Sequence, residues 1–268
     1  LFIISTSCFV ISDIVVSDAN TTNLIFCSGS NQDSDNFVAP IEDPIISIDF
    51  GTYLGGDSRE YDCCVAGDDE GFIYVAGSTS SSDFPLINPT YYDQEGTDCF
   101  VAKLNQAGDE ILYSTYIGGS GVDTLDAITV EEGFVYITGF TRSPDFPIVN
   151  SIQNPTSTGD CFIVKLNSDD GSINYSRVIG GDDKIFPSDI AIDIDGCIYV
   201  TGFTYAASIR YATSDLIDIS DEWGQYNLFV AKITEGESWL DYLTILGGSE
   251  GSSGNSIEVD ENKNAFIV

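Results

Sequence analysis

The sequence contains no histidine and no methionine, and only 9 of its 268 residues are lysine or arginine. Histidine is the most common general acid or base and the most common neutral metal ligand. Its absence excludes Ser–His and Cys–His nucleophile pairs and histidine-based zinc or iron sites. Carboxylate pairs of the kind that glycosidases use remain available, but no spacing in the sequence singles one out. We therefore expect no catalytic residues and a protein that is not an enzyme.

Acidic residues dominate the charge, since 43 Asp and Glu against 9 Lys and Arg give a formal net charge of −34. Proteins bind nucleic acid by neutralising phosphates with Lys and Arg, so nucleic acid is excluded as a partner. The acids can form a solvated surface or can bind cations in clusters, and a solvated surface is the more common outcome. With 43% hydrophobic residues, the chain can still fold around a core.

The first residues are apolar and carry no charge before Asp13. They are typical of the hydrophobic part of a secretory signal, which predicts a leader at 1–16 and a secreted or cell-surface protein. The segment is too short for a transmembrane helix, so no membrane span is predicted; an ordinary buried strand is the alternative. Residues 17–43 are polar and rich in turn formers, which predicts a linker. A chain that lacks an initial Met and ends within KNAFIV is expected to be part of a longer protein.

An octet recurs along the chain, as DCFVAKLN at 98–105, DCFIVKLN at 160–167 and NLFVAKIT at 227–234. Two other motifs recur in register with it. The first occurs as TYLGG, TYIGG, VIGG and ILGG, ending at 56, 119, 181 and 248. The second occurs as IYVAGSTSSSDFP, VYITGFTRSPDFP and IYVTGFTYAAS, starting at 73, 135 and 198. The period of 62 to 67 residues predicts units at roughly 57–119, 120–181 and 182–248, with a partial unit at 249–268.

Each unit predicts four strands, which in the second unit are 126–130, 133–141, 161–167 and 172–181. These runs are rich in Val, Ile, Phe and Tyr and are bounded by Gly, Asp, Asn and Ser. They are apolar at nearly every position, which indicates burial on both faces of the sheet. Sheets that stack around an axis bury both faces, so residues 44–268 predict an all-β fold, a partial β-propeller of four-stranded antiparallel blades. A stacked β-solenoid is the alternative.

The ordered motifs Y-[LI]-G-G, [IV]-Y-[VI]-[TA]-G-x-T, D-F-P and D-x-F-[VI]-x-K-L-N resemble the SBBP-type β-propeller repeat of bacterial and archaeal secreted and cell-surface proteins. The resemblance covers roughly residues 45–268. It implies a propeller, often of about seven blades, that occurs beside adhesive or anchoring modules. It implies no catalytic residues. Three complete units are too few to close such a propeller.

Long connections join the second and third strands of each unit, at 80–97, 142–159 and 205–226, whereas the turns within the other strand pairs are tight. Binding residues tend to lie on long loops held by a rigid scaffold, so we expect an interaction or adhesion scaffold that binds a protein or a surface glycan. A carbohydrate-active enzyme with a carboxylate pair and a structural spacer remain alternatives. Trp and Tyr dominate contact hot spots. The candidate ligand-binding residues are Tyr91, Tyr92, Tyr205, Tyr211 and Trp223.

Lys103, Lys165 and Lys232 occupy the same place in the three octets. The functional interpretation is a row of cations that binds an acidic ligand. A residue repeated in every unit usually serves the repeat itself. We therefore expect structural lysines, paired with a nearby carboxylate such as Asp98 or Asp160.

Asp62, Asp126 and Asp189, together with Asn255, lie close to the start of the first strand in successive units. Equivalent positions there would surround the mouth of the propeller channel, where carboxylates could hold Ca²⁺; a hydrated acidic rim is the alternative. The turns DDEG at 68–71, SDDG at 168–171 and DIDG at 193–196 resemble the start of a calcium loop but lack its remaining ligands, so hairpin turns are favoured. We expect no cofactor, with Ca²⁺ as the one candidate.

The seven cysteines include no Cys-x-x-Cys spacing, so neither a zinc site nor a redox motif is indicated. Cys99 and Cys161 occupy equivalent positions of adjacent units. Facing sheets lie about 10 Å apart, which is too far for a disulfide, so these two are expected to remain unpaired.

Overall fold

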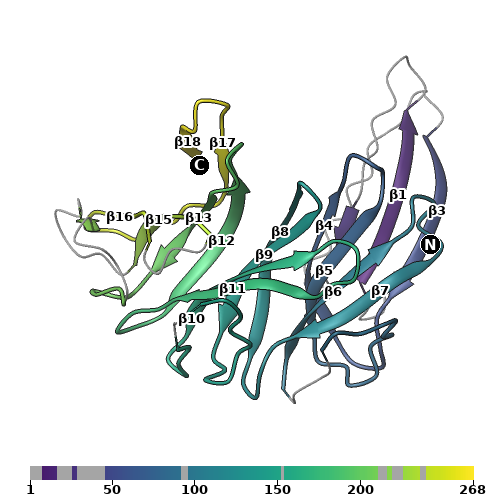
Figure 1. Ribbon diagram of the computed structural model, residues 1–268, viewed down its shortest axis with the longest axis horizontal. Helices are drawn as coiled ribbons and strands as arrows, with labels where there is room; N and C mark the ends of the chain where they lie inside the picture. Colours follow the sequence, from purple (N-terminus) through teal and green to yellow (C-terminus); the bar gives the residue numbers. More distant parts are fainter. Residues whose placement is uncertain are drawn as a thin grey trace.

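The computed structural model describes residues 8–16, 26–28, 46–91, 96–151, 154–210, 216–218, 226–235 and 240–268. All regular structure in these residues is β-strand, arranged in five sheets. The sheets lie side by side, from the N-terminal sheet on the right of Figure 1 to the third blade on the left. None of these ranges contains a helix that could cross a membrane.

Two complete blades share one strand order, in which each strand pairs antiparallel with its neighbour in sequence. This arrangement confirms the propeller-type blades that the repeat predicts. The connections at 80–97 and 142–159 match the predicted long loops. The first blade contains β4 (Glu60–Gly67), β5 (Ile73–Thr79), β6 (Asp98–Leu104) and β7 (Ile111–Ile117), and the second contains β8 (Asp123–Glu131), β9 (Phe134–Thr141), β10 (Asp160–Asn167) and β11 (Ile173–Ile179).

The third blade gains a fifth strand that the repeat does not predict. Its four regular strands are β12 (Ile185–Ile192), β13 (Ile198–Thr204), β15 (Asn227–Ile233) and β16 (Tyr242–Leu246). β14 (Leu216–Asp218) belongs to the third long loop and pairs in parallel with β16. This loop therefore reaches the outer edge of its own blade. A fourth unit begins with the hairpin β17 (Ile257–Val259) and β18 (Ala265–Ile267).

The N-terminal sheet has the order β2-β1-β3, formed by β1 (Cys8–Val16), β2 (Phe26–Ser28) and β3 (Ile46–Leu54). The segment predicted as a leader contains the strand β1. Its removal as a signal stays a prediction. The predicted linker at 17–43 lies outside the described residues except for β2.

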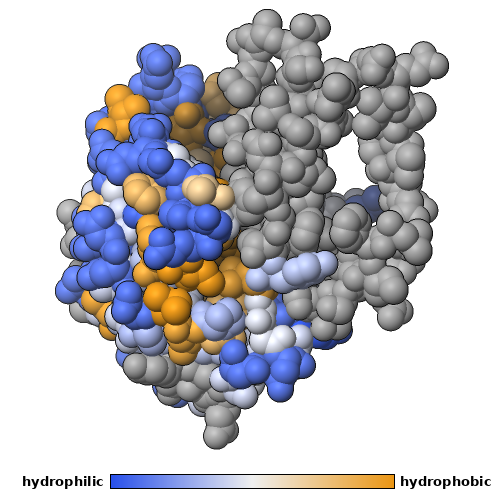
Figure 2. Space-filling model, turned by 90° about the vertical axis from the view of Figure 1, so that its right-hand side faces the viewer, coloured by the Kyte–Doolittle hydropathy of each residue, from blue (hydrophilic) through white to orange (hydrophobic). Residues whose placement is uncertain are grey.

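Hydrophobic side chains fill the space between adjacent blades. β5 and β6 are buried at every position, as continuous apolar runs predict. One core joins the first two blades and a second core joins the second and third blades. The first strands of successive blades, β4, β8, β12 and β17, lie against one another. Hydrophilic residues cover most of the described surface on the side shown in Figure 2, with hydrophobic residues in the gaps between them.

The first two long loops turn back along the outer strand of their own blade. The backbone N–H of Ile87 donates to Ser114 Oγ over 2.8 Å, and that of Val149 donates to Ser176 Oγ over 2.6 Å. Further along the first loop, the backbone N–H of Tyr91 donates to Thr115 Oγ1 over 2.9 Å. Tyr91, one of the candidate ligand-binding residues, is consequently half-buried against the core of the first two blades.

Candidate functional site

Aromatic side chains gather at the end of the third blade from which its long loop leaves. We call this group the aromatic cluster; it consists of Phe140, Phe186, Phe203, Tyr205 and Tyr226. Consecutive ring centroids lie 4.4, 5.0, 5.3 and 5.9 Å apart, in the order Phe140, Phe186, Phe203, Tyr226 and Tyr205. Ring pairs at these separations attract one another by about 0.5–1.5 kcal/mol beyond their buried area. Phe140 is 5% exposed and Tyr205 is 44% exposed, so the cluster runs from the core to the surface.

The strand register shows that this concentration of rings is particular to the third blade. Phe186 pairs with Phe203 on the neighbouring strand, and Tyr205 and Tyr226 border the long loop. The equivalent residues are Tyr61, Ser78, Ser80 and Thr97 in the first blade, and Thr124, Phe140, Arg142 and Gly159 in the second. Four positions that hold one ring in each earlier blade therefore hold four rings in the third.

Tyr205 is the sequence-predicted contact residue that the structure places on this surface. Tyr92, Tyr211 and Trp223 lie outside the described residues. Phe186 and Phe203 escape sequence reasoning because each belongs to an apolar strand and looks like a core residue. Aligning the three units position by position would have revealed them.

An ion pair fixes the start of the third loop beside the cluster. Arg210 Nη2 donates to Asp160 Oδ1 over 2.7 Å, and the backbone N–H of Arg210 donates to the Gly180 carbonyl over 2.6 Å. Asp160 is 0% exposed and also accepts the backbone N–H of Thr156 over 2.8 Å. The loop is thereby tied to the second blade, which keeps the nearby ring of Tyr205 on a rigid support.

Buried carboxylates hold the same end of the first two blades. Glu60 accepts hydrogen bonds from Thr79 Oγ1 over 3.0 Å and Ser81 Oγ over 2.6 Å. Asp123 accepts one from Ser143 Oγ over 2.7 Å, and burial raises the pKa of this carboxyl although its hydrogen bonds lower it. Phe84 and Phe146 of the D-F-P segments are buried.

The three repeated lysines make the contacts of structural residues. Lys103 Nζ donates to the carbonyl of Ser168 in the second blade over 3.0 Å, and Lys165 pairs with Glu235 of the third blade. Lys232 Nζ lies 3.6 Å from Asp193 Oδ2 of its own blade. The suggested partners Asp98 and Asp160 are not used, because each lies at the other end of the strand that carries the lysine.

Aromatic rings support each amine as well. Lys103 Nζ lies 4.3 Å from the ring of Phe72, and Lys165 Nζ lies 4.0 Å from that of Phe134. Burial disfavours the charge of Lys165, but the Glu235 carboxylate and Tyr136 outweigh it, so the pKa of Lys165 is raised. These lysines are better suited to joining blades than to binding a ligand.

The acids predicted to surround the channel mouth are not equivalent in the structure. A β-bulge between Leu125 and Ala127 contains Asp126, whereas Asp189 follows the corresponding bulge and pairs with Thr201. A shift of one residue turns a side chain to the other face. Asp189 accepts hydrogen bonds from Ser256 Oγ over 2.7 Å and the Ile257 N–H over 2.8 Å, so it joins the third blade to the fourth unit.

Asp62 and Asp126 are the members of the predicted ring that influence each other. Both side chains are exposed at the surface. Burial by the surrounding protein, and then the charge of Asp62, raise the pKa of Asp126 to about 7. Asn255 belongs to the fourth unit, where its backbone N–H donates to the Val268 carbonyl over 2.7 Å. Within the described ranges, no three acidic or cysteine side chains are placed to share a metal ion.

We expect Asp126→Asn to stabilise the protein at neutral pH. The folded pKa of about 7 lies above the ordinary value of 3.8, so the folded state binds the proton more tightly than the unfolded state. The stability contributed by protonated Asp126 is present at about pH 4 and is lost as the pH rises through about 7. Because solvent screens this exposed carboxylate, we expect Asp126→Asn to raise the free energy of unfolding by about 1 kcal/mol more at pH 8 than at pH 5. Urea denaturation at pH 5 and pH 8 measures it, and the same effect at both values would contradict this assignment.

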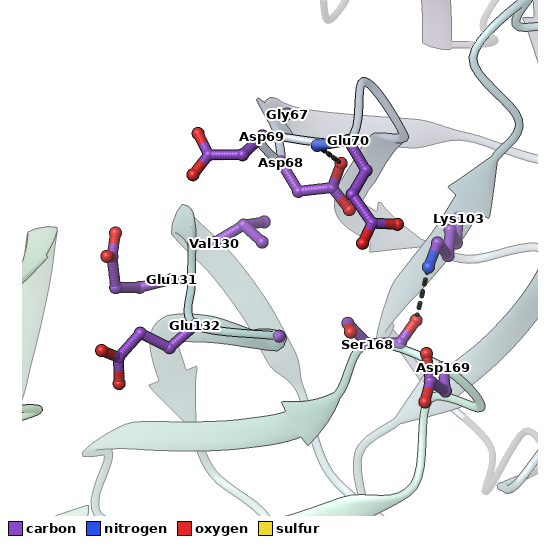
Figure 3. A pocket seen from close by; sticks show the side chains of 11 residues that line it. Gly67, Asp68, Asp69, Glu70, Lys103, Val130, Glu131, Glu132, Ser168 and Asp169 are labelled. Atoms are coloured by element: carbon purple, nitrogen blue, oxygen red, sulfur yellow. Dashed lines mark hydrogen bonds between the residues drawn. The ribbon is translucent and has the colours of Figure 1, made fainter.

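An acidic hollow of about 340 Å³ lies on the face of the short turns, between the first two blades (Figure 3). The turns 68–71 and 168–171 both border it, and Lys103 forms part of its wall. In Figure 3 the carboxylates spread around the hollow and do not converge on one point. Asp68 accepts the backbone N–H groups of Glu70 and Phe72 over 3.1 and 2.9 Å, which is the hairpin role that the sequence favours.

The two cysteines of the repeated octet behave as small buried hydrophobic residues. Cys99 and Cys161 are fully buried and unpaired, as their equivalent positions predict. Burial raises the pKa of both thiols. Cys63, Cys64 and Cys197 are half-buried.

Comparison with known proteins agrees with this architecture. The family model SBBP, described as a β-propeller repeat, matches residues 174–210, which run from the last strand of the second blade into the third long loop. Regulatory protein FlaEY of Caulobacter vibrioides is 24% identical over 173 residues, which cover 60% of this chain and 17% of that protein. The chain thus spans less than a fifth of that relative's length. The recurring motifs, the four-stranded blades and the family match together show that this chain contains an SBBP-type β-propeller repeat, matched at residues 174–210.

Proposed function

We propose that the protein is a non-enzymatic interaction scaffold, secreted or displayed at the cell surface, which binds a partner protein through the aromatic cluster. The concentration of four rings in one blade carries this proposal. Residues repeated in every blade serve the repeat, so Tyr205 and Tyr226, whose equivalents in the first two blades are not aromatic, are available for another role. Similarity to a regulatory protein favours a protein over a glycan as the partner, because regulation commonly works through contacts between proteins.

The geometry of Tyr205 suits a contact residue. Its ring meets those of Phe186 and Phe203 nearly at right angles, at interplanar angles of 80° and 77°. These neighbours restrict the ring before any partner arrives, so less side-chain entropy is lost on binding. Tyrosines with this combination of exposed area and rigid support are frequent hot spots.

Replacing Tyr205 with alanine is expected to weaken partner binding about 30-fold, which corresponds to a hot-spot contribution of about 2 kcal/mol. The immobilised chain would be exposed to extracellular proteins of the source organism, and the affinity of the captured protein would then be measured. Tyr53→Ala is the matched control, because Tyr53 is 58% exposed but belongs to the N-terminal sheet. A partner whose affinity for the folded Tyr205→Ala variant is unchanged would refute the proposed site.

A further inference from the structure

We infer that the aromatic cluster receives a positively charged segment of its partner, rich in arginine or lysine. This inference rests on the proposed function, because it specifies the chemistry of the protein that the cluster binds. Three observations support it: the cation contacts that the chain already makes with rings, the charge around the exposed rings, and the composition of the adjoining loop.

The chain already places its own cations on aromatic faces. The faces of aromatic rings attract cations, and arginine is the more frequent partner. Lys232 Nζ lies 5.0 Å from the ring of Tyr199, in the same way as the other two repeated lysines. The guanidinium of Arg142 lies 5.4 Å from the ring of Phe140, at the buried end of the aromatic cluster itself. A guanidinium therefore already contacts the first ring of the cluster.

At the other end of the cluster, the cation–ring contacts of the described residues do not include the rings of Tyr205 and Tyr226. Acidic residues border this end: Asp182 and Asp183 are exposed just before Phe186, and exposed Glu250 adjoins Gly251, which packs against the ring of Tyr226. Lys184 adjoins these acids, and its carbonyl accepts the backbone N–H of Tyr205 over 3.0 Å, while its side-chain Cγ lies toward Gly159 and the ring of Phe140. An incoming basic group is therefore favoured at the Tyr205 and Tyr226 end.

The third long loop has the same charge bias. Its basic residue, Arg210, is engaged by the buried carboxylate of Asp160. Residues 211–225 contain no lysine or arginine and contain four acids, Asp215, Asp218, Asp221 and Glu222. With a net charge of −34 over the whole chain, the protein attracts basic partners and repels acidic ones during encounter.

The test uses three fluorescently labelled peptides, in which serine alternates with arginine, with glutamine or with glutamate. Their binding to the whole chain is measured by fluorescence anisotropy. The salt concentration is about 0.15 M, where long-range electrostatic attraction is screened. We expect the arginine peptide to bind best. Tyr205→Ala should weaken the affinity for this peptide about 10-fold. Tyr205→Phe keeps the ring face, so its affinity for the peptide should stay within about threefold of that of the unsubstituted protein. Tyr53→Ala should have no effect.

A second pair of variants separates local charge from the charge of the whole chain. Glu250→Gln should weaken arginine-peptide binding about threefold, because it removes an acid next to the exposed rings. Glu261→Gln removes an equally exposed acid from the β17–β18 turn and should leave binding unchanged. Equal effects of both substitutions would show attraction by net charge alone and overturn the inference.

The outcomes distinguish this inference from the proposed function. The inference of a basic partner is overturned if Tyr205→Ala does not change binding of the arginine peptide. It is also overturned if the glutamate peptide binds more tightly than the arginine peptide and this binding depends on Tyr205. The scaffold proposal survives either result if the captured extracellular protein still requires Tyr205. If no partner or peptide requires Tyr205, both fail.

Discussion

Arg210→Met is expected to lower the free energy of unfolding by about 3 kcal/mol, because breaking a buried ion pair leaves an uncompensated charge. Asp160 is 0% exposed, and the substitution would leave its carboxylate with hydrogen bonds from Thr156 alone among those described. The value falls at the low end of the usual range because Arg210 is 30% exposed. Methionine retains most of the arginine stem, so the loss reports the charge and not an empty space. Urea denaturation at pH 7 measures the change.

A double-variant cycle provides the control for this prediction. Asn227 occupies the position of β15 that Asp160 occupies in β10, so an amide is compatible with this site. Asp160→Asn combined with Arg210→Met should recover most of the lost stability, since neither charge is then left alone. Arg142→Met, an exposed arginine, should change stability by less than about 0.5 kcal/mol. If the Arg210→Met variant has the same urea midpoint of unfolding as the unsubstituted protein, the ion pair does not stabilise the junction between the blades.

The second large effect concerns the lysine that joins the first two blades. Lys103→Met should cost about 2–3 kcal/mol, because the carbonyl of Ser168 loses its buried donor and the rings of Phe72 and Tyr74 lose their cation. Hydrogen exchange should also accelerate at the amide of Gly171 in the turn that follows Ser168. That local readout separates the loss of the inter-blade bond from a general loss of packing.

Lys232→Met is the matched control. Lys232 has the same sequence position and the same type of ring contact, but its carboxylate partner Asp193 belongs to its own blade. It is also more open to solvent, so we expect a loss of about 1 kcal/mol. A loss as large as that of Lys103→Met would mean that the ring contact, and not the bond between blades, determines the effect.

The strands and loops of this protein are predictable because their signals are local. Turn formers such as Asn, Asp and Gly bound each apolar run, and the predicted long loops at 80–97 and 142–159 match the structure to the residue. The partner of Lys103 could not be predicted, because it is a backbone carbonyl 65 residues away. A backbone acceptor has no side-chain identity for a sequence pattern to reveal.

The candidate site was predictable only in part. Tyr205 stands out because its loop departs from the other two, whereas Phe186 and Phe203 become neighbours only through the register of β12 and β13. The placement of the acids predicted to surround the channel mouth depends on strand register in the same way. β8 and β12 each have a bulge opposite the same Thr–Gly step of the neighbouring strand, but Asp126 is the extra residue of its bulge whereas Asp189 follows the extra residue, so the two acids occupy different places.

The lysine contacts also give the array of blades a direction. Lys103 and Lys165 each extend from one blade to the next along the chain, and the acceptor is in the later blade in both cases. Loss of a later blade therefore leaves a lysine amine of the blade before it without its acceptor. Loss of an earlier blade removes only a donor from the acceptor in the blade that follows. Stepwise unravelling, whether by a pulling force or by a protease, should then differ in ease according to the end from which it starts.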